Sequence, residues 1–172
     1  MTAQIMDRFV FRGEEYRLVG GEGGPLVSPQ DFGMEPGFIH TACWRGFYST
    51  YEIKDDQIFI VEMTMRESKG NYKAINNKMP EVTGNQALYE EIYLPVPFTG
   101  RLLLAKDFIQ ELYVHMGFQE PTSFKTVLEL TFKDGCLIDF QDKSKEMEQE
   151  RATLKKGYKR GDIAEGIDEA FS

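Results

Sequence analysis

The sequence predicts a mainly β protein in which antiparallel hairpins curl into a barrel or a two-layer sandwich, followed by one or two C-terminal helices. Two similar segments, 44–53 and 98–104, favour this fold, because each opens with an aromatic residue, a second residue and a glycine, and continues as a strand-like run. We expect Gly46 and Gly100 to need a positive φ or to lie where a side chain would collide with a neighbour. The third observation is Asp134-Gly135, a dipeptide typical of the tight turn between antiparallel strands.

Four hairpins are predicted, each from two apolar-rich runs around a short turn. They join residues 8–11 to 15–19, 47–53 to 58–65, 101–105 to 109–116, and 126–132 to 136–140. For the third hairpin a helix beginning at Asp107 is an alternative, because Gln110 follows at the spacing of a capping box. The glycine-rich run 20–25 is predicted to be a loop, since glycine has much freedom to lose in a strand and proline lacks a donor. It also lacks the dinucleotide-binding spacing, because Leu26 stands where the third glycine would be.

The middle of the chain is less regular. Residues 67–84 are polar and are predicted to form a long excursion, with at most a short strand at 72–75. A strand is expected over 89–96. Pro95 and Pro97 end it, because proline cannot donate to a ladder and suits the end or edge of a sheet.

The C-terminal part changes to helical spacing. Ser144 is a candidate N-cap for a first helix, and a second helix is expected from Asp162, where a glutamate three residues later completes a capping box. We expect the chain, 1–172, to form a single domain with its sheet over about 8–141 and a helical segment over about 143–172.

The chain is acidic, since 20 basic and 28 acidic residues give a net charge of −8 and a pI near 4.9. Such a surface repels phosphate backbones and anionic headgroups, so we expect neither a nucleic acid nor a membrane as a partner. The N-terminus has no charged start followed by an apolar run, and no apolar stretch is long enough to span a bilayer. We therefore expect a soluble, cytoplasmic protein.

Four strings are distinctive: residues 40–47 (HTACWRGF), 51–53 (YEI), 95–100 (PVPFTG) and 112–118 (LYVHMGF). Together they resemble a group of small bacterial proteins that is functionally uncharacterised. The resemblance spans about residues 8–140 and implies a bacterial source. It implies no activity and no site residues.

The candidate metal ligands are His40, Cys43, His115 and Cys136, which are all the histidine and cysteine residues of the chain. A structural zinc site usually has two close ligand pairs, whereas here only His40 and Cys43 are close, so we expect no metal site. Neither cysteine lies in a nucleophile signature, and no Gly-x-Ser-x-Gly elbow occurs. We expect two inert thiols, no disulfide and no cofactor.

The most site-like group combines aromatic rings with one guanidinium, which can stack on or clamp a planar or anionic ligand. Its six members are Trp44, Arg45, Tyr48, Tyr51, Tyr113 and His115. In a strand over 109–116, Tyr113 and His115 share a face with Glu111, which could tune the histidine. The alternative is a structural aromatic cluster in which carbonyl groups hold Arg45.

Two functions are compatible with this sequence. The first is a non-enzymatic binding protein that engages a protein partner through its acidic surface and exposed aromatic residues, as a toxin-neutralising or regulatory protein does. The second is a small-ligand protein or enzyme with a pocket at the mouth of the barrel, around Trp44, Arg45, Tyr113 and His115. We expect the first. The sequence contains no signal for the oligomeric state.

Overall fold

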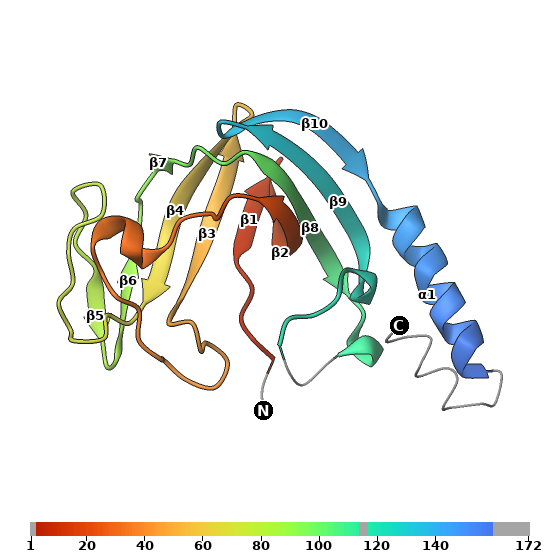
Figure 1. Ribbon diagram of the computed structural model, residues 1–172, viewed down its shortest axis with the longest axis horizontal. Coiled ribbons are helices and arrows are strands. Elements are labelled where there is room, and N and C mark those ends of the chain that lie inside the picture. Colours follow the sequence, from red (N-terminus) through yellow and green to blue (C-terminus); the bar gives the residue numbers. More distant parts are fainter. Residues whose placement is uncertain (1–2, 114–116, 160–172) are drawn as a thin grey trace.

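The computed structural model describes residues 3–113 and 117–159, and in this part of the chain ten strands form one mixed sheet (Figure 1). In chain order the strands are β1 (Arg8–Phe11), β2 (Glu14–Gly23), β3 (Phe47–Lys54), β4 (Gln57–Met65), β5 (Glu81–Thr83), β6 (Gln86–Tyr89), β7 (Leu94–Pro95), β8 (Gly100–Phe108), β9 (Phe124–Lys133) and β10 (Cys136–Asp142). The helical elements are α1 (Ser144–Lys159) and the 3-10 turns η1 (Pro29–Phe32), η2 (Gln110–Leu112) and η3 (Pro121–Ser123). The prediction of a mainly β fold with a C-terminal helix is confirmed.

The sheet curls into a ring that does not close into a true barrel. Its strands follow the order β10-β9-β8-β2-β1-β3-β4-β6-β5, with β7 beside β4. Among the described strands, the ring meets itself only where Cys136 of β10 pairs with Gln57 of β4, next to a 3.0 Å hydrogen bond from Ile58 N–H to Gly135 O. Most pairs are antiparallel, as expected, but β1 and β3 are parallel, because the chain crosses between them through β2 and the long segment 24–46.

The inside of the ring holds the main hydrophobic core. Phe9 and Tyr51 stack there with ring centroids 4.8 Å apart, and both side chains are fully buried. A smaller cluster, formed by Ala105, Phe124 and Val127, belongs to the outer face of β8 and β9. The period-2 alternation of strands explains the two clusters, since neighbouring residues point to opposite faces.

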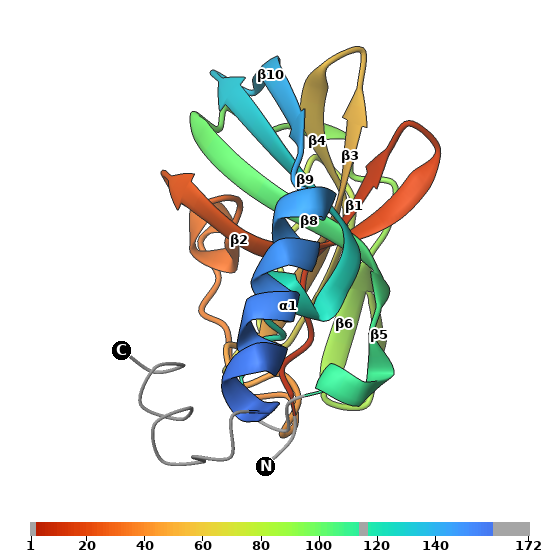
Figure 2. The same ribbon diagram turned by 90° about the vertical axis from the view of Figure 1, so that its right-hand side faces the viewer.

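Helix α1 covers part of this outer face (Figure 2). It packs against β9 and η3, and Arg151 fastens it there by donating from Nη1 to the carbonyl oxygens of Thr122 and Phe124, at 2.9 and 2.7 Å. The second helix expected from Asp162 lies outside the described residues.

The third predicted hairpin is wrong. Residues 101–105 do form a strand, but β8 continues to Phe108 and pairs with β2 and β9 rather than with 109–116. The alternative helix is also wrong, because Asp107 has a φ of +61° within β8 and only the short turn η2 follows. The reason is tertiary: aromatic residues of this segment pack on the outer face instead, where the rings of Phe108 and Tyr113 meet edge to face.

Two smaller predictions also need correction. The strand expected over 89–96 is interrupted, because Glu91 and Tyr93 adopt positive φ between β6 and β7. The excursion over 67–84 has no strand at 72–75, where only an isolated bridge forms at the last residue, but it contains β5. Short polar sequences carry little periodicity, so β5 had no signal.

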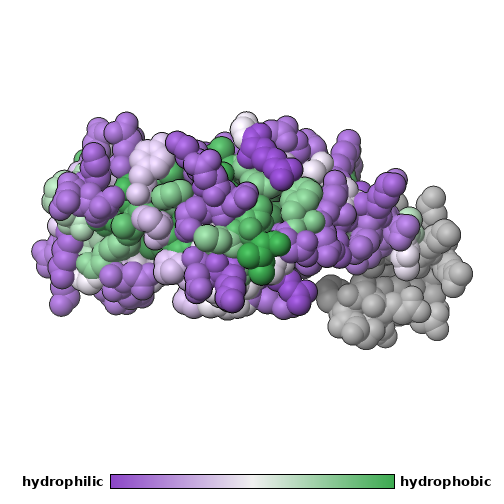
Figure 3. Space-filling view, turned by 90° about the horizontal axis from the view of Figure 1, so that it is seen from above, coloured by the Kyte–Doolittle hydropathy of each residue, from purple (hydrophilic) through white to green (hydrophobic). Residues whose placement is uncertain are grey.

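The surface mixes polar and apolar side chains. Figure 3 shows it from above, with apolar residues in view among polar ones along the middle of the molecule. Large aromatic side chains that are about half exposed include Phe38, Trp44, Tyr93 and Phe118. Among the described residues, no helix is both long and apolar enough to cross a membrane.

Candidate functional site

The prediction of a loop for the glycine-rich run 20–25 is wrong, because its first four residues are the end of β2 and pair with β8. The backbones approach too closely for a side chain. A Cβ on Gly21 would lie 2.8 Å from the carbonyl oxygen of Arg101, and one on Gly23, whose φ is +120°, would collide with the carbonyl of Thr99. Strand pairing at this distance therefore requires the residue that the sequence pattern assigned to a loop.

The expectation for Gly46 and Gly100 is confirmed. Their φ values are +85° and +149°, and a Cβ would collide with the carbonyl oxygen of Gly37 or of Glu22, respectively. Gly46 precedes β3, which forms a hairpin with β4, whereas Gly100 begins β8, whose next partner in sequence is the distant β9. The two positions are therefore alike in requiring glycine but not in the connectivity of their strands.

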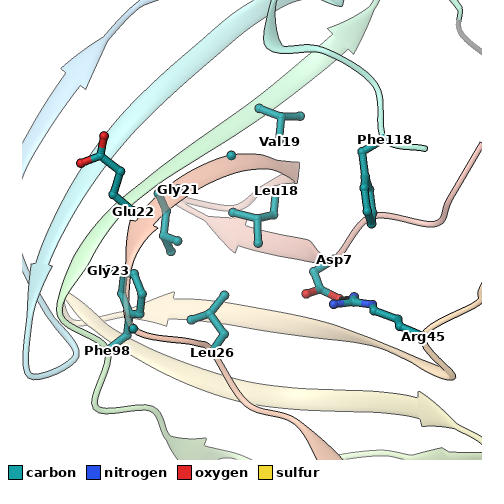
Figure 4. Close-up of a pocket in the computed structure, with 13 residues that line it drawn as sticks. Asp7, Leu18, Val19, Gly21, Glu22, Gly23, Leu26, Arg45, Phe98 and Phe118 are labelled. Carbon is teal, nitrogen blue, oxygen red and sulfur yellow. Dashed lines mark hydrogen bonds and ion pairs between the residues drawn. The ribbon is translucent and has the colours of Figure 1, made fainter. Parts of the chain in front are cut away.

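A groove of about 340 Å³ opens where β2 turns away from β1. In Figure 4, Leu18 of β2 and Leu26 of the following segment face each other across it, and the ring of Phe118 stands beyond them, near the charged end. We call this the β2 groove, and the residues that define it are Asp7, Leu18, Leu26, Arg45, Phe98, Leu102 and Phe118. One of its walls is the backbone of Val19–Gly24, which carries few side chains.

An ion pair closes one end of the groove. Arg45 Nη2 lies 2.5 Å from Asp7 Oδ1, and the guanidinium also sits 4.4 Å from the ring centroid of Phe47. The same carboxylate oxygen accepts the N–H of Ser49 at 2.8 Å. Burial raises the pKa of Asp7, and the attraction of Arg45 and the two hydrogen bonds oppose that rise. The predicted alternative, in which carbonyl groups hold Arg45, is replaced by a carboxylate and an aromatic ring.

Two further polar groups, the hydroxyls of Tyr51 and Ser49, are buried in the protein. Tyr51, one of the predicted site residues, is fully buried, and its hydroxyl donates to the carbonyl of Val27 at 3.5 Å. Burial raises its pKa above the ordinary tyrosine value. The Ser49 hydroxyl is buried and has no hydrogen-bond partner among the described residues. Tyr51 therefore belongs to the core and offers no surface to a ligand.

The structure separates the other predicted site residues. The Trp44 side chain is 52% exposed, and the backbone N–H of this residue donates to Gln4 Oε1 at 2.9 Å. Tyr48 and Tyr113 line a different cavity, on the outer face of the sheet, and His115 lies outside the described residues. The described members of the predicted cluster are thus divided between two places, because residues 109–113 do not form the strand that would have joined them.

This second site, the outer cavity, measures about 610 Å³. Arg8 and Arg17 are directly opposite each other in the β1–β2 register, so both guanidinium groups reach its wall. They share one carboxylate, Glu15, whose Oε1 lies 2.5 Å from Arg17 and 3.8 Å from Arg8. Apolar side chains, the two tyrosines and the glutamines Gln4, Gln110 and Gln119 complete the lining.

The β2 groove contains few ionisable side chains. Among its described lining residues, the ionisable ones are Asp7, Glu22 and Arg45, and two of these are paired with each other. No three His, Cys, Asp or Glu side chains in the described part of the chain are grouped to hold a metal ion. Of the candidate thiols, Cys43 is buried and Cys136 is exposed, and neither is in a disulfide.

Sequence reasoning missed most of this groove. Asp7, Leu18 and Leu26 lie in three separate segments, and no spacing relates them. The available signal was the glycine-rich run, since glycine within a strand often marks a place where another backbone or a ligand approaches closely. No protein-family model, curated protein or solved structure matches the chain. The resemblance to small bacterial proteins stays a prediction.

Proposed function

We propose that this chain is a non-enzymatic binding protein and that the β2 groove receives a segment of a protein partner. The observation that carries the proposal is the groove itself: a concave, mainly apolar surface that reaches solvent along the glycine-rich end of β2. Apolar pockets with a few fixed polar groups are the usual form of a recognition site. The Asp7–Arg45 pair supplies such groups at one end.

Exposed aromatic side chains beside the groove support a protein partner. Phe118 is 50% exposed on the groove, and Trp44 adjoins Arg45 in the chain and is equally open. Gln4 ties their two loops together, because its side chain accepts the Trp44 N–H and its own N–H donates to the carbonyl of Gly117. Held aromatic residues are frequent anchors at interfaces. The two free thiols agree with the proposed cytoplasmic location.

Site-specific crosslinking tests this proposal. A photoreactive phenylalanine analogue would replace Phe118 in the groove or, as a matched control of similar exposure, Tyr93 on a distant surface. We expect a discrete partner adduct in lysate of the source organism only from position 118, and its loss when Leu26→Asp is added to that protein. Equal adducts from both positions, or an adduct that survives the Leu26 change, would contradict the proposal.

The outer cavity favours a second candidate function, the binding of a small anionic molecule with an aromatic or apolar body. Two guanidinium groups share a single carboxylate there, which leaves a local positive charge on an acidic chain. Arginine binds planar carboxylate and phosphate groups through its fork of donors. A panel of aromatic carboxylates and organic phosphates should raise the melting temperature of the native protein and of an Arg101→Gln control, but not of Arg8→Gln or Arg17→Gln. Equal shifts in all four proteins would refute this candidate.

A further inference from the structure

We propose that the partner's segment binds in the β2 groove as an added β-strand, hydrogen-bonded to the open edge of Val19–Gly23. This inference rests on the proposed function, because it specifies how a protein partner would occupy the groove. The partner's segment is extended, is neutral or basic, and carries apolar side chains at alternate positions.

On the side facing the groove, Val19–Gly23 has no partner strand among the described residues. β1 pairs only with the first part of β2, from Glu14 to Arg17, and the last bond on that side runs from Leu18 N–H to Asp7 O at 2.9 Å. Beyond it, β8 is the only described segment that pairs with β2. Alternate N–H and C=O groups of a strand point to its two edges, so Val19–Gly23 presents on the groove side backbone groups that no other described strand pairs with.

An incoming strand can reach the backbone N–H and C=O groups of Val19–Gly23. Gly21–Gly24 are exposed, and glycine has no side chain to obstruct a second backbone. Proteins usually protect a free edge with lysine side chains, bulges or a covering loop. On this stretch the described protection is limited to Glu22 and to Pro25 just beyond the strand, while the register shift lies between Leu18 and Gly20, at its start.

The groove also offers a pocket for a side chain of the partner, in addition to backbone hydrogen bonds. In strand addition, main-chain hydrogen bonds supply affinity and pockets for alternate side chains supply specificity. Leu18 and Leu26 flank a place for one apolar side chain, and Phe98 lines the groove near Gly23 (Figure 4). Two other edges of the described sheet are free for comparison, β5 and the part of β10 beyond Cys136, and both are exposed but line neither the β2 groove nor the outer cavity.

Charge and shape decide the class of occupant. Glu22 is exposed on the edge and the chain carries a net charge of −8, so an acidic segment would be repelled. The groove lies between β2 and the segment that returns through Leu26, a space suited to a single strand rather than to the broad edge of another sheet. An extended segment therefore fits better than a second copy of this chain.

The experiment begins with a phage-displayed library of random 12-residue peptides selected on the full-length protein. We expect enriched peptides with alternating apolar residues and no net negative charge, and about tenfold weaker binding by Leu26→Asp and by Phe118→Ala, which leaves the core unchanged. Exchanging Glu22→Lys should shift the selected charge towards acidic, whereas Glu90→Lys, at an exposed site elsewhere, should not.

N-methylation of one selected peptide, one residue at a time, then isolates the backbone bonds. We expect losses of about tenfold at every second residue and little change between them, together with slower amide exchange over Val19–Gly23. Losses without this alternation would overturn strand addition while leaving the groove as a protein-binding site. Failure to select any peptide that responds to the groove variants would overturn both proposals. A concentration-dependent dimer that protects the same amides would assign the edge to a second copy instead.

Discussion

Asp7 and Arg45 form an ion pair in which the two partners have unequal environments. The Asp7 side chain is 6% exposed, whereas that of Arg45 is 38% exposed, although the two are 2.5 Å apart. Loss of the ion pair would therefore cost the Asp7 carboxylate more than the Arg45 guanidinium, because an unpaired charge in a buried place is costly. Arg45 thus stabilises the fold and forms one end of the β2 groove at the same time.

The first prediction follows from this asymmetry. Arg45→Met should lower the free energy of unfolding at pH 7 by roughly 1–3 kcal/mol, because it leaves a buried carboxylate unpaired. Asp7→Asn should cost less, since the amide oxygen can still accept the N–H of Ser49. Urea denaturation of both variants and of the double variant would measure the coupling between them. Equal losses from the two single changes would contradict the asymmetry.

The pH dependence of that loss is a second prediction. Burial raises the pKa of Asp7 above 3.8, and removing Arg45 removes the main influence that opposes the rise. A raised pKa in the folded state means that stability is retained below the unfolded pKa and is lost as the pH rises through the folded value. The deficit of Arg45→Met should therefore shrink as the pH is lowered towards about 4. A deficit that is constant with pH would show that Asp7 is not its cause.

The third prediction concerns Glu67, which is nearly buried and fastens two loops. Its carboxylate accepts the N–H of Glu35 at 2.9 Å and that of Lys69 at 2.7 Å, and these bonds lower its pKa below 4.5. The stabilisation should be present above about pH 4.5 and be lost as the pH falls through the lower folded pKa. Melting temperatures of the native protein and Glu67→Gln should differ clearly at pH 7 and converge in acid. A difference that grows in acid would contradict this assignment.

A pair of turn glycines provides the fourth prediction. Gly13 and Gly135 occupy equivalent turn positions with φ values of +78° and +84°, but Gly13 faces open space, whereas a Cβ on Gly135 would collide with the carbonyl of Val96 and the side chain of Gln57. Gly13→Ala should cost about 1–2 kcal/mol for its backbone conformation, and Gly135→Ala at least about 2 kcal/mol more. Equal costs in chemical denaturation would show that the contact between β10 and β4 is loose.

The two thiols give the fifth prediction. Cys136 is exposed, whereas Cys43 is buried, and burial raises the pKa of its thiol. A thiol-specific reagent should therefore modify one cysteine rapidly in the native protein and the second only at the rate of unfolding. Cys136→Ser should abolish the rapid phase. Two rapid phases would contradict the burial of Cys43.

Much of the local structure follows from the sequence. The Asp134-Gly135 hairpin, the strands around residues 47–65 and the helix from Ser144 are formed as predicted, because their signals lie within a few neighbouring residues. The positive φ of Gly46 and Gly100 is likewise predicted from a local pattern of neighbouring residues. In each case the chain's own backbone preferences point to the structure that is formed.

The tertiary structure decided which segments meet. The sequence alone determined the β class, three of the four predicted hairpins and the C-terminal helix. The parallel pairing of β1 with β3, the strand made from a glycine-rich run, and the groove beside it depend on residues far apart in the chain. Gly23 shows the reason. Its freedom predicts a loop when it is considered alone, but the close backbone of β8 permits only glycine there, and that constraint exists only after the sheet has formed.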